Sequence, residues 1–241
     1  LTGAAGNQSC LSFAQSDLSE KERMGGLVGC EAARVFFEIE TRPHQVVRQL
    51  DASLSSLALY HKEFHDGPTH RILMTAHREV SVPLQPLPSL QVAEAEFAEA
   101  SVRLEKLKAE GAPAVKTYPA LMVEDRAKII LEKVKAGVSQ EGLTFEVVGF
   151  RVDDFVLVGM PGEPFAEIGL ATKARSTASH TMFAGYCNGV LAYWPTAETV
   201  AQGGMSVRSA VKSYKIPAPP TAETADIIVA AFDELLKDLK L

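Results

Sequence analysis

The segment GMPGEPFAEIG, residues 159–169, places the carboxylate of Glu163 in a turn between Pro161-Gly162 and Pro164. The prolines restrict the backbone on both sides of the acid, and that rigidity suits a metal ligand whose position must not drift. A structural interpretation competes with this one, because a carboxylate at a helix N-terminus is stabilised by the helix dipole by roughly 0.3–1 kcal/mol. Glutamate is not a preferred N-cap residue. From this segment alone, metal ligand and helix start both remain open.

Two residues with hydroxyl groups are further candidates for chemistry. Tyr193 in NGVLAYWPT lies between an expected strand and a proline, which is typical of a packed aromatic whose hydroxyl is hydrogen-bonded at its edge. Ser9 in GAAGNQSC is compatible with an activated nucleophile, but the G-x-S-x-G pattern of a nucleophile elbow is missing. Cys10 is an alternative nucleophile for which the sequence indicates no partner. By themselves these positions indicate a packed tyrosine and a loop serine.

Histidines form the third group of candidates, in the segment YHKEFHDGPTH. The spacing of His61 and His65 would place both on one face of a helix, as in some metal sites, and His70 follows. An H-E-x-x-H pattern is missing, and the residues after His65 are typical of a polar loop. A metal site at these histidines is therefore a weaker alternative to one at Glu163.

The elements that must position Glu163 can be predicted from the hydrophobic pattern. LTFEVVGFRV and DFVLVGMPG flank Asp153-Asp154, which predicts a β-hairpin whose second strand leads into the Glu163 turn. EPFAEIGLATKARS predicts a helix with Pro164 at its first position. HTMFAGYCNGVLAYWP predicts a strand, a glycine-containing bend and a short second strand, with Trp194 in the core. PTAETVAQGG then predicts a helical turn.

The rest of the chain predicts helices around one extended segment. MGGLVGCEAARVFFEIE predicts a helix through Glu38, and HRILMTAHREVSVPLQPLP predicts a strand. Two apolar stripes joined by EGAPAVKTYP predict a helical hairpin at about 89–137, with solvated outer faces. A last helix is expected to have Thr221 as its N-cap and to face inward at Ile227, Ala231 and Leu235. The fold class is α+β (mixed α/β), a sheet-based domain with packed helices.

Composition excludes several classes of protein. The 241 residues can bury a sizeable core, and 22% charged residues is ordinary for a globular chain. The net charge of −6 and the absence of a basic cluster argue against nucleic-acid binding. The sequence contains no apolar run of about 18 residues, the length that a transmembrane segment needs. Three cysteines are too few for a disulfide framework. Because the chain begins without Met in LTGAAGNQSC, we expect an internal start, with targeting and active-site residues in a preceding part.

Three segments, GAAGNQS, MPGEPFAEIGLATKARS and GYCNGVLAYWPTAETVAQGG, occur in this order. Together they resemble the catalytic domain of the neutral/alkaline (non-lysosomal) ceramidase family, and most of all its bacterial members of unassigned substrate. The Pro-Gly-Glu and N-G-x-x-x-Y-x-P-T elements are specific as a pair, and the resemblance spans nearly the whole chain. It implies that residues 1–241 are the C-terminal portion of a single catalytic domain, with the helical hairpin inside it.

The resemblance implies a metal site and a reaction. One zinc ion would be bound by Glu163, by Tyr193 and by two His from the N-terminal part of the same protein. The family's Gly-Asp-Val-Ser-Pro loop matches residues 6–10 here, which implies catalytic positions at Asn7 and Ser9. The implied reaction is hydrolysis of an amide (N-acyl) bond of a lipid or small molecule, in which zinc lowers the pKa of a bound water toward about 7. An extracytoplasmic location follows from the resemblance alone.

The chain departs from the family's pattern at several positions. Asn7 replaces the aspartate of the loop and Cys10 replaces its proline, while Val190 stands where ceramidases often have another tyrosine. Met205 stands where the family has a tyrosine near the reacting carbonyl. Loss of such an oxyanion donor costs on the order of 3 kcal/mol of transition-state stabilisation.

The ligand count separates two hypotheses. Glu163 and Tyr193 supply two ligands of the four or so that zinc takes, and no T-H-x-H-x-G segment is present in the chain. The first hypothesis is a zinc-dependent amidohydrolase that is completed by the preceding part of the protein. The second is a family-derived binding or structural protein without catalysis.

Overall fold

The computed structural model describes residues 1–9, 18–50, 58–67 and 71–241. They fall into two units, one made of Leu1–Ser9 and Ile72–Leu241 and the other of Cys10–Arg71. Helices and both antiparallel and parallel strand pairs make up the chain, which confirms the predicted α+β class.

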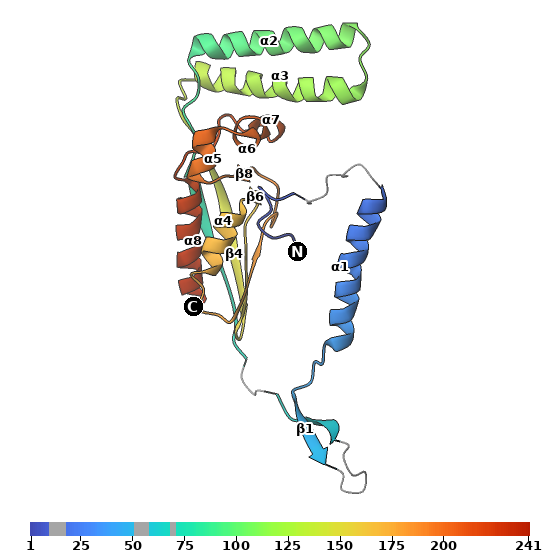
Figure 1. The fold of residues 1–241 in the computed structure, drawn as a ribbon. Helices are drawn as coiled ribbons and strands as arrows, with labels where there is room; N and C mark the ends of the chain where they lie inside the picture. The colour runs from blue at the N-terminus through green and yellow to red at the C-terminus, as the bar shows by residue number, and fades with distance from the viewer. Residues whose placement is uncertain (10–17, 51–57, 68–70) are drawn as a thin grey trace. The chain divides into compact units, whose positions relative to one another are not determined.

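A four-stranded sheet is the centre of the larger unit (Figure 1). Its order is β3-β4-β5-β7, with antiparallel pairing from β3 to β5 and parallel pairing of β5 with β7. Val152 pairs with Phe155, so Asp153-Asp154 form the predicted two-residue turn. The strands are β3 (Leu73–Pro83), β4 (Gly142–Val152), β5 (Phe155–Gly159) and β7 (His180–Ala184).

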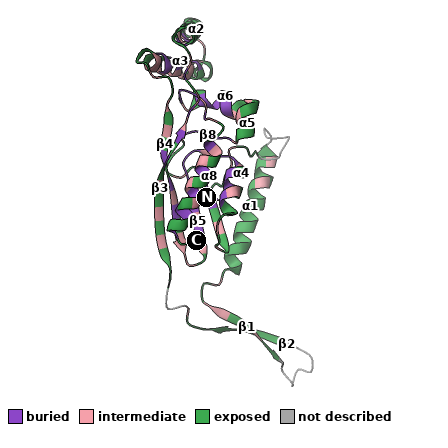
Figure 2. Cartoon of the chain, turned by 90° about the vertical axis from the view of Figure 1, so that its left-hand side faces the viewer, coloured by how far each residue is buried: buried purple, intermediate pink, exposed green. Residues whose placement is uncertain are grey.

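One face of this sheet is buried, as the alternation of burial along β3 and β4 shows (Figure 2). Helix α8 (Thr224–Asp238) packs on β3 and β4, and α4 (Ala166–Lys173) packs on both α8 and β7. Antiparallel sheets commonly bury one face and expose the other. The core between sheet and helices contains, among others, Val147, Val158, Trp194, Phe232 and Leu235.

Helix α8 starts later than predicted. Its N-cap is Glu223, two residues downstream of the predicted N-cap Thr221. The backbone N–H of Thr221 instead donates to the carbonyl of Pro83, which continues an extended contact with the end of β3. The buried face differs in part from the predicted one: it is carried by Ile228, Val229, Phe232, Leu235 and Leu236, while Ile227 and Ala231 are half-buried.

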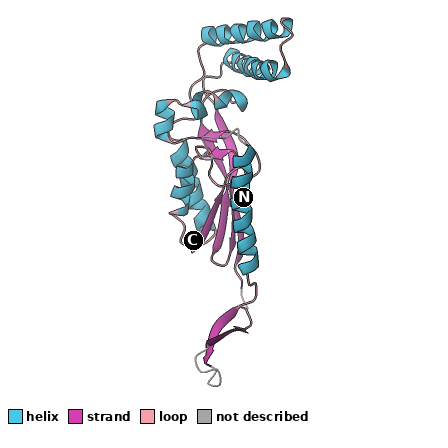
Figure 3. Cartoon of the chain, turned by 45° about the vertical axis from the view of Figure 1, so that its right-hand side comes forward, coloured by secondary structure: helices cyan, strands magenta, loops and turns pink. Residues whose placement is uncertain are grey.

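The helical hairpin is confirmed as α2 (Leu90–Ala109) and α3 (Ala114–Lys135), which lie side by side (Figure 3). Arg126 of α3 attaches the hairpin to the chain after α7, since its guanidinium donates to the carbonyls of Ile216 and Pro217 at 2.7 and 2.8 Å. Short helices precede this attachment, namely α5 (Ala197–Gln202), α6 (Met205–Arg208) and α7 (Ala210–Ser213).

The smaller unit contains the predicted helix, α1 (Leu18–Glu38), and an antiparallel pair of strands, β1 (His44–Leu50) and β2 (Ala58–Phe64). No described residue of α1 is buried, as its green colour in Figure 2 shows. Neither α1 nor any other helix in the described part of the chain combines the length and apolar character that crossing a membrane requires.

The prediction that His61 and His65 share one face of a helix is wrong, because His61 lies in strand β2. Four residues along a strand span about 13 Å, so these two positions lie too far apart to share one metal ion as neighbouring ligands. His61 contacts Glu63 at 3.2 Å instead. His70 lies outside the described residues.

Candidate functional site

Two short strands bring the predicted ligands together. Strand β6 (Glu163–Pro164) pairs in parallel with β8 (Tyr193–Trp194), and the register places Glu163 directly beside Tyr193. Thirty positions of sequence separate the two residues, so only the fold makes them neighbours. Glu163 follows the carboxyl end of β5, the end at which ligand sites form in parallel sheets.

The prediction that Pro164 begins a helix is wrong, and with it the interpretation of Glu163 as a helix start. Helix α4 begins at Ala166, after Phe165 as N-cap. The backbone N–H groups of Glu163 and Phe165 donate to Ala192 and Trp194, at 2.8 and 3.1 Å. Pairing with β8 therefore keeps this backbone extended for two residues before the helix can start.

The turn before Glu163 is fixed on several sides. The N–H of Gly162 donates to the carbonyl of Gly189 at 2.9 Å, and the carbonyl of Gly162 accepts from Tyr186 at 3.0 Å. The buried indole N–H of Trp194 donates to the carbonyl of Pro161 at 2.8 Å. The backbone position of Glu163 is therefore set by contacts that need no ligand.

Three tyrosine hydroxyls surround the carboxylate of Glu163. The hydroxyl of Tyr214 donates to Oε1 of Glu163, and the ring of Tyr214 meets that of Tyr193 edge-on, with centroids 5.8 Å apart. Partial desolvation, together with hydrogen bonding to Glu163, raises the pKa of Tyr186 to about 12. The same two causes raise the pKa values of Tyr193 and Tyr214. The three phenols are therefore neutral near pH 7 and can donate to an acceptor at this position.

The opening loop lies against the Glu163 turn. The N–H of Gly6 donates to the carbonyl of Pro164 at 2.8 Å. A Cβ at position 6 would come within 2.3 Å of the carbonyl oxygen of Glu163, so the approach requires glycine. Ser9 is exposed three residues further on, and Cys10 lies outside the described residues.

Asn7 attaches this loop to helix α4. Its Oδ1 accepts from the N–H of Ala166 at 2.9 Å, and its Nδ2 donates to Oε2 of Glu167 at 2.8 Å. An aspartate at position 7 would place two carboxylates in contact, which accounts for the asparagine in physical terms. Both polar ends of the Asn7 side chain are thus engaged by α4.

Replacing Asn7 by alanine is expected to destabilise the larger unit by about 1 kcal/mol, the usual cost of losing a helix cap. Urea unfolding followed by circular dichroism measures this loss. Gln8→Ala is the matched control, because Gln8 is exposed and its side-chain amide donates to Oδ1 of Asn7 rather than capping α4 itself. Equal unfolding midpoints for Asn7→Ala and Gln8→Ala would contradict the capping role.

Tyr186 and Tyr214 were not predicted as site residues. Tyr214 is 51 positions from Glu163, and nothing in its local sequence, SAVKSYKIP, indicates a site. The two positions at which the family's tyrosines are replaced are exposed, with 55% of Val190 and 67% of Met205 accessible. Of the three phenols near Glu163, Tyr193 stands at a position that the resemblance implies, whereas Tyr186 and Tyr214 do not.

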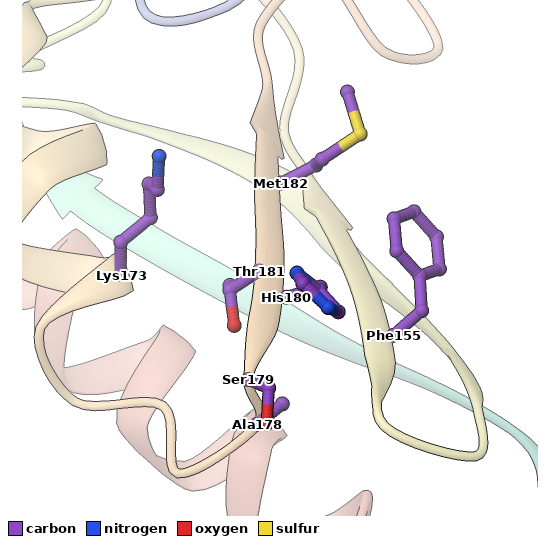
Figure 4. A pocket seen from close by; sticks show the side chains of 7 residues that line it. All are labelled: Phe155, Lys173, Ala178, Ser179, His180, Thr181 and Met182. Carbon is purple, nitrogen blue, oxygen red and sulfur yellow. The ribbon is translucent and has the colours of Figure 1, made fainter. Parts of the chain in front are cut away.

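Two cavities in the larger unit differ in their relation to Glu163. One of about 530 Å³ lies where β5 and β7 begin, with Lys173 and Phe155 on either side of β7 (Figure 4), at the opposite end of these strands from Glu163. The other, of about 380 Å³, borders the Glu163 turn at Pro161, and its lining is mixed, with the apolar Phe145, Val190 and Leu191 beside the polar Thr144, Glu146 and Asn188. Of these two cavities, the second is the one that borders the Glu163 turn.

The residues at Glu163 fit one side of a zinc site. A carboxylate and a phenol oxygen, held side by side by the β6–β8 register, are both ligands that zinc accepts once the phenol is deprotonated. Within the described ranges no three His, Cys, Asp or Glu residues form a group that could hold a metal ion.

Comparison with known proteins gives no further assignment. No protein-family model, no curated protein and no solved structure matches this chain.

Proposed function

We propose that this chain is part of a zinc-dependent hydrolase of the neutral ceramidase type that cleaves an amide (N-acyl) bond. One observation carries the proposal, namely the parallel register that sets Glu163 beside Tyr193. The contact of Gly6 with Pro164 adds support, because it brings the loop that contains Ser9 to the same turn. Two His from the N-terminal part of the protein would complete the zinc ligands, as the resemblance implies.

The residues of this chain would hold and orient the reacting groups. The carboxylate of Glu163 and the oxygen of Tyr193 would bind the metal from one side. Bound zinc would lower the pKa of a water molecule and polarise the amide carbonyl. The hydroxyls of Ser9 and Tyr186 are the chain's candidates for donating to the oxygen that becomes negative during the reaction. A neutral phenol suits that task, and a tyrosine with its ordinary pKa of about 10 is protonated near pH 7.

The cavity beside the turn supports the proposed substrate class. Its volume of about 380 Å³ and the apolar part of its lining, Phe145, Val190 and Leu191, suit the hydrocarbon part of an N-acyl compound, while Thr144, Glu146 and Asn188 are the polar residues of the lining. Glu163 lies two residues after Pro161, which borders that cavity. We therefore propose a lipid amide or a small amide with an apolar acyl group as substrate.

Glu163→Ala is expected to abolish zinc binding, since it removes one of the two ligands that this chain supplies. The measurement is zinc content per molecule of the complete protein after dialysis, with about one zinc expected in the unmodified protein. Glu99→Ala is the matched control, because Glu99 is an exposed carboxylate on α2, in the helical hairpin. The same zinc content in Glu163→Ala and in the unmodified protein would refute the proposal.

A second candidate is a binding or structural protein without catalysis. It is favoured by Met205, whose exposed side chain carries no donor, and by Asn7, whose polar atoms are engaged by α4. Hydrolysis of N-acyl amides by the zinc-loaded complete protein distinguishes the candidates. Zinc binding without turnover, or no zinc binding at all, would favour the second.

A further inference from the structure

We infer that Tyr214 is a positioning residue for Glu163: its hydroxyl holds one carboxylate oxygen and so presents the other to a metal ion beside Tyr193. The inference rests on the proposed function and deepens it, since it concerns the same site. It assigns to Tyr214 a role that nothing in its sequence context indicates.

The contacts of Tyr214 reach both residues proposed as ligands. Its hydroxyl donates to Oε1 of Glu163, and its ring packs edge-on against Tyr193 with centroids 5.8 Å apart. A carboxylate has two oxygens, and a donor on Oε1 restricts the rotation of the group. A metal ion would bind the other oxygen, Oε2, and take the place of the hydrogen bond that Tyr193 makes with this carboxylate. Tyr214 can therefore orient one ligand while it supports the other through ring packing.

The position of Tyr214 is fixed by the helical hairpin. The next residue, Lys215, adopts a left-handed conformation with φ of 53°, and its Nζ contacts Asp125 of α3 at 2.8 Å. The carbonyl oxygens of the next two residues, Ile216 and Pro217, accept hydrogen bonds from the guanidinium of Arg126 in α3. The hydroxyl is thus placed before any ligand binds, and little side-chain entropy remains to be lost when the carboxylate is held.

Partners of this kind contribute measurably to metal affinity. Carboxylates that bind metals are usually hydrogen-bonded in turn, and removing the outer partner typically weakens metal binding 10- to 100-fold.

The test is the zinc affinity of the complete protein, measured by competition with a chromophoric chelator. Tyr214→Phe removes only the hydroxyl, and we expect zinc to bind about 10- to 100-fold more weakly. Tyr118→Phe is the matched control, because Tyr118 is a tyrosine of α3 that is 62% exposed, and its affinity should equal that of the unmodified protein. Tyr214→Met, which fills similar space without a hydroxyl, should weaken binding as Phe does and serves if Tyr214→Phe does not fold.

A second readout separates positioning from a merely structural role. The visible absorption of bound Co²⁺, which replaces zinc as probe, reports ligand geometry and is expected to change in Tyr214→Phe and not in Tyr118→Phe. Unchanged zinc affinity and cobalt spectrum in Tyr214→Phe, while Glu163→Ala loses the metal, would overturn the inference and leave the proposed function intact. Retention of zinc by Glu163→Ala would overturn both.

Discussion

Replacing Gly162 by alanine is expected to destabilise the larger unit by about 2–5 kcal/mol and to displace Glu163. Gly162 has φ of 80°, a conformation that costs an L-residue roughly 1–2 kcal/mol. An added Cβ would also lie 2.5 Å from the carbonyl oxygen of Ala192 and 2.6 Å from Nε1 of Trp194. Relieving that overlap costs typically 1–3 kcal/mol more. Because both contacts belong to the segment that ends in β8, the register that sets Glu163 beside Tyr193 must shift.

Gly137 provides the control that separates strain from overlap. It has a similar φ of 83° at the end of α3, and a Cβ there would meet no atom within 4 Å. Urea unfolding of Gly137→Ala should therefore report the conformational cost alone. Gly162→Ala should lose more, and its complete protein should also lose zinc affinity. Equal destabilisation by the two substitutions would contradict the close packing of the Glu163 turn against β8.

The sequence predicts elements well where a local pattern decides them. The β4–β5 hairpin follows from alternating apolar residues on either side of Asp153-Asp154, and the structure pairs Val152 with Phe155 as expected. The α2–α3 hairpin follows from apolar stripes at helical spacing, and those stripes are the faces along which the helices meet. In both cases neighbours in the sequence are also neighbours in the structure.

The predicted boundaries fail where a distant segment competes for backbone hydrogen bonds. Pro164 favours the first position of a helix, but Ala192 and Trp194 accept from the backbone on either side of it and keep it extended. Thr221 is a good N-cap residue, but its N–H is taken by Pro83. Each competing partner lies more than 25 positions away, so no local window contains the information.

The residues of the candidate site also fall into those that the sequence identifies and those that it misses. Glu163 and Tyr193 were identified from a rigid turn and from a resemblance, and the structure places them side by side. Tyr186 and Tyr214 were missed because a tyrosine that donates to a carboxylate and one that packs in a core have the same local sequence signature. Their convergence on Glu163 depends on the bend after β7 and on the anchoring of the Tyr214 segment by α3.

The second large effect is expected at Trp194, which is fully buried in the main core. Trp194→Ala removes a ring that packs 4.6 Å, centroid to centroid, from that of Phe145. Large-to-small substitution of a buried aromatic costs about 3–5 kcal/mol. Tyr118→Ala, which truncates an exposed aromatic, should change stability by no more than about 0.5 kcal/mol. Circular dichroism in urea measures both, since Trp194 is the only tryptophan and cannot serve as probe in its own variant.

Trp194→Phe separates the two contributions of this side chain to the site. Phenylalanine keeps most of the apolar contact but loses the indole N–H, so the carbonyl of buried Pro161 is left without its donor. An unsatisfied buried carbonyl costs about 1–3 kcal/mol, which is less than the loss expected for alanine. Because Pro161 lies two residues before Glu163, this variant should also weaken zinc binding by the complete protein. If Trp194→Phe lost stability while zinc affinity stayed unchanged, the turn would hold Glu163 in place without the indole, and the rigidity would reside in the backbone contacts of Gly162 and Glu163.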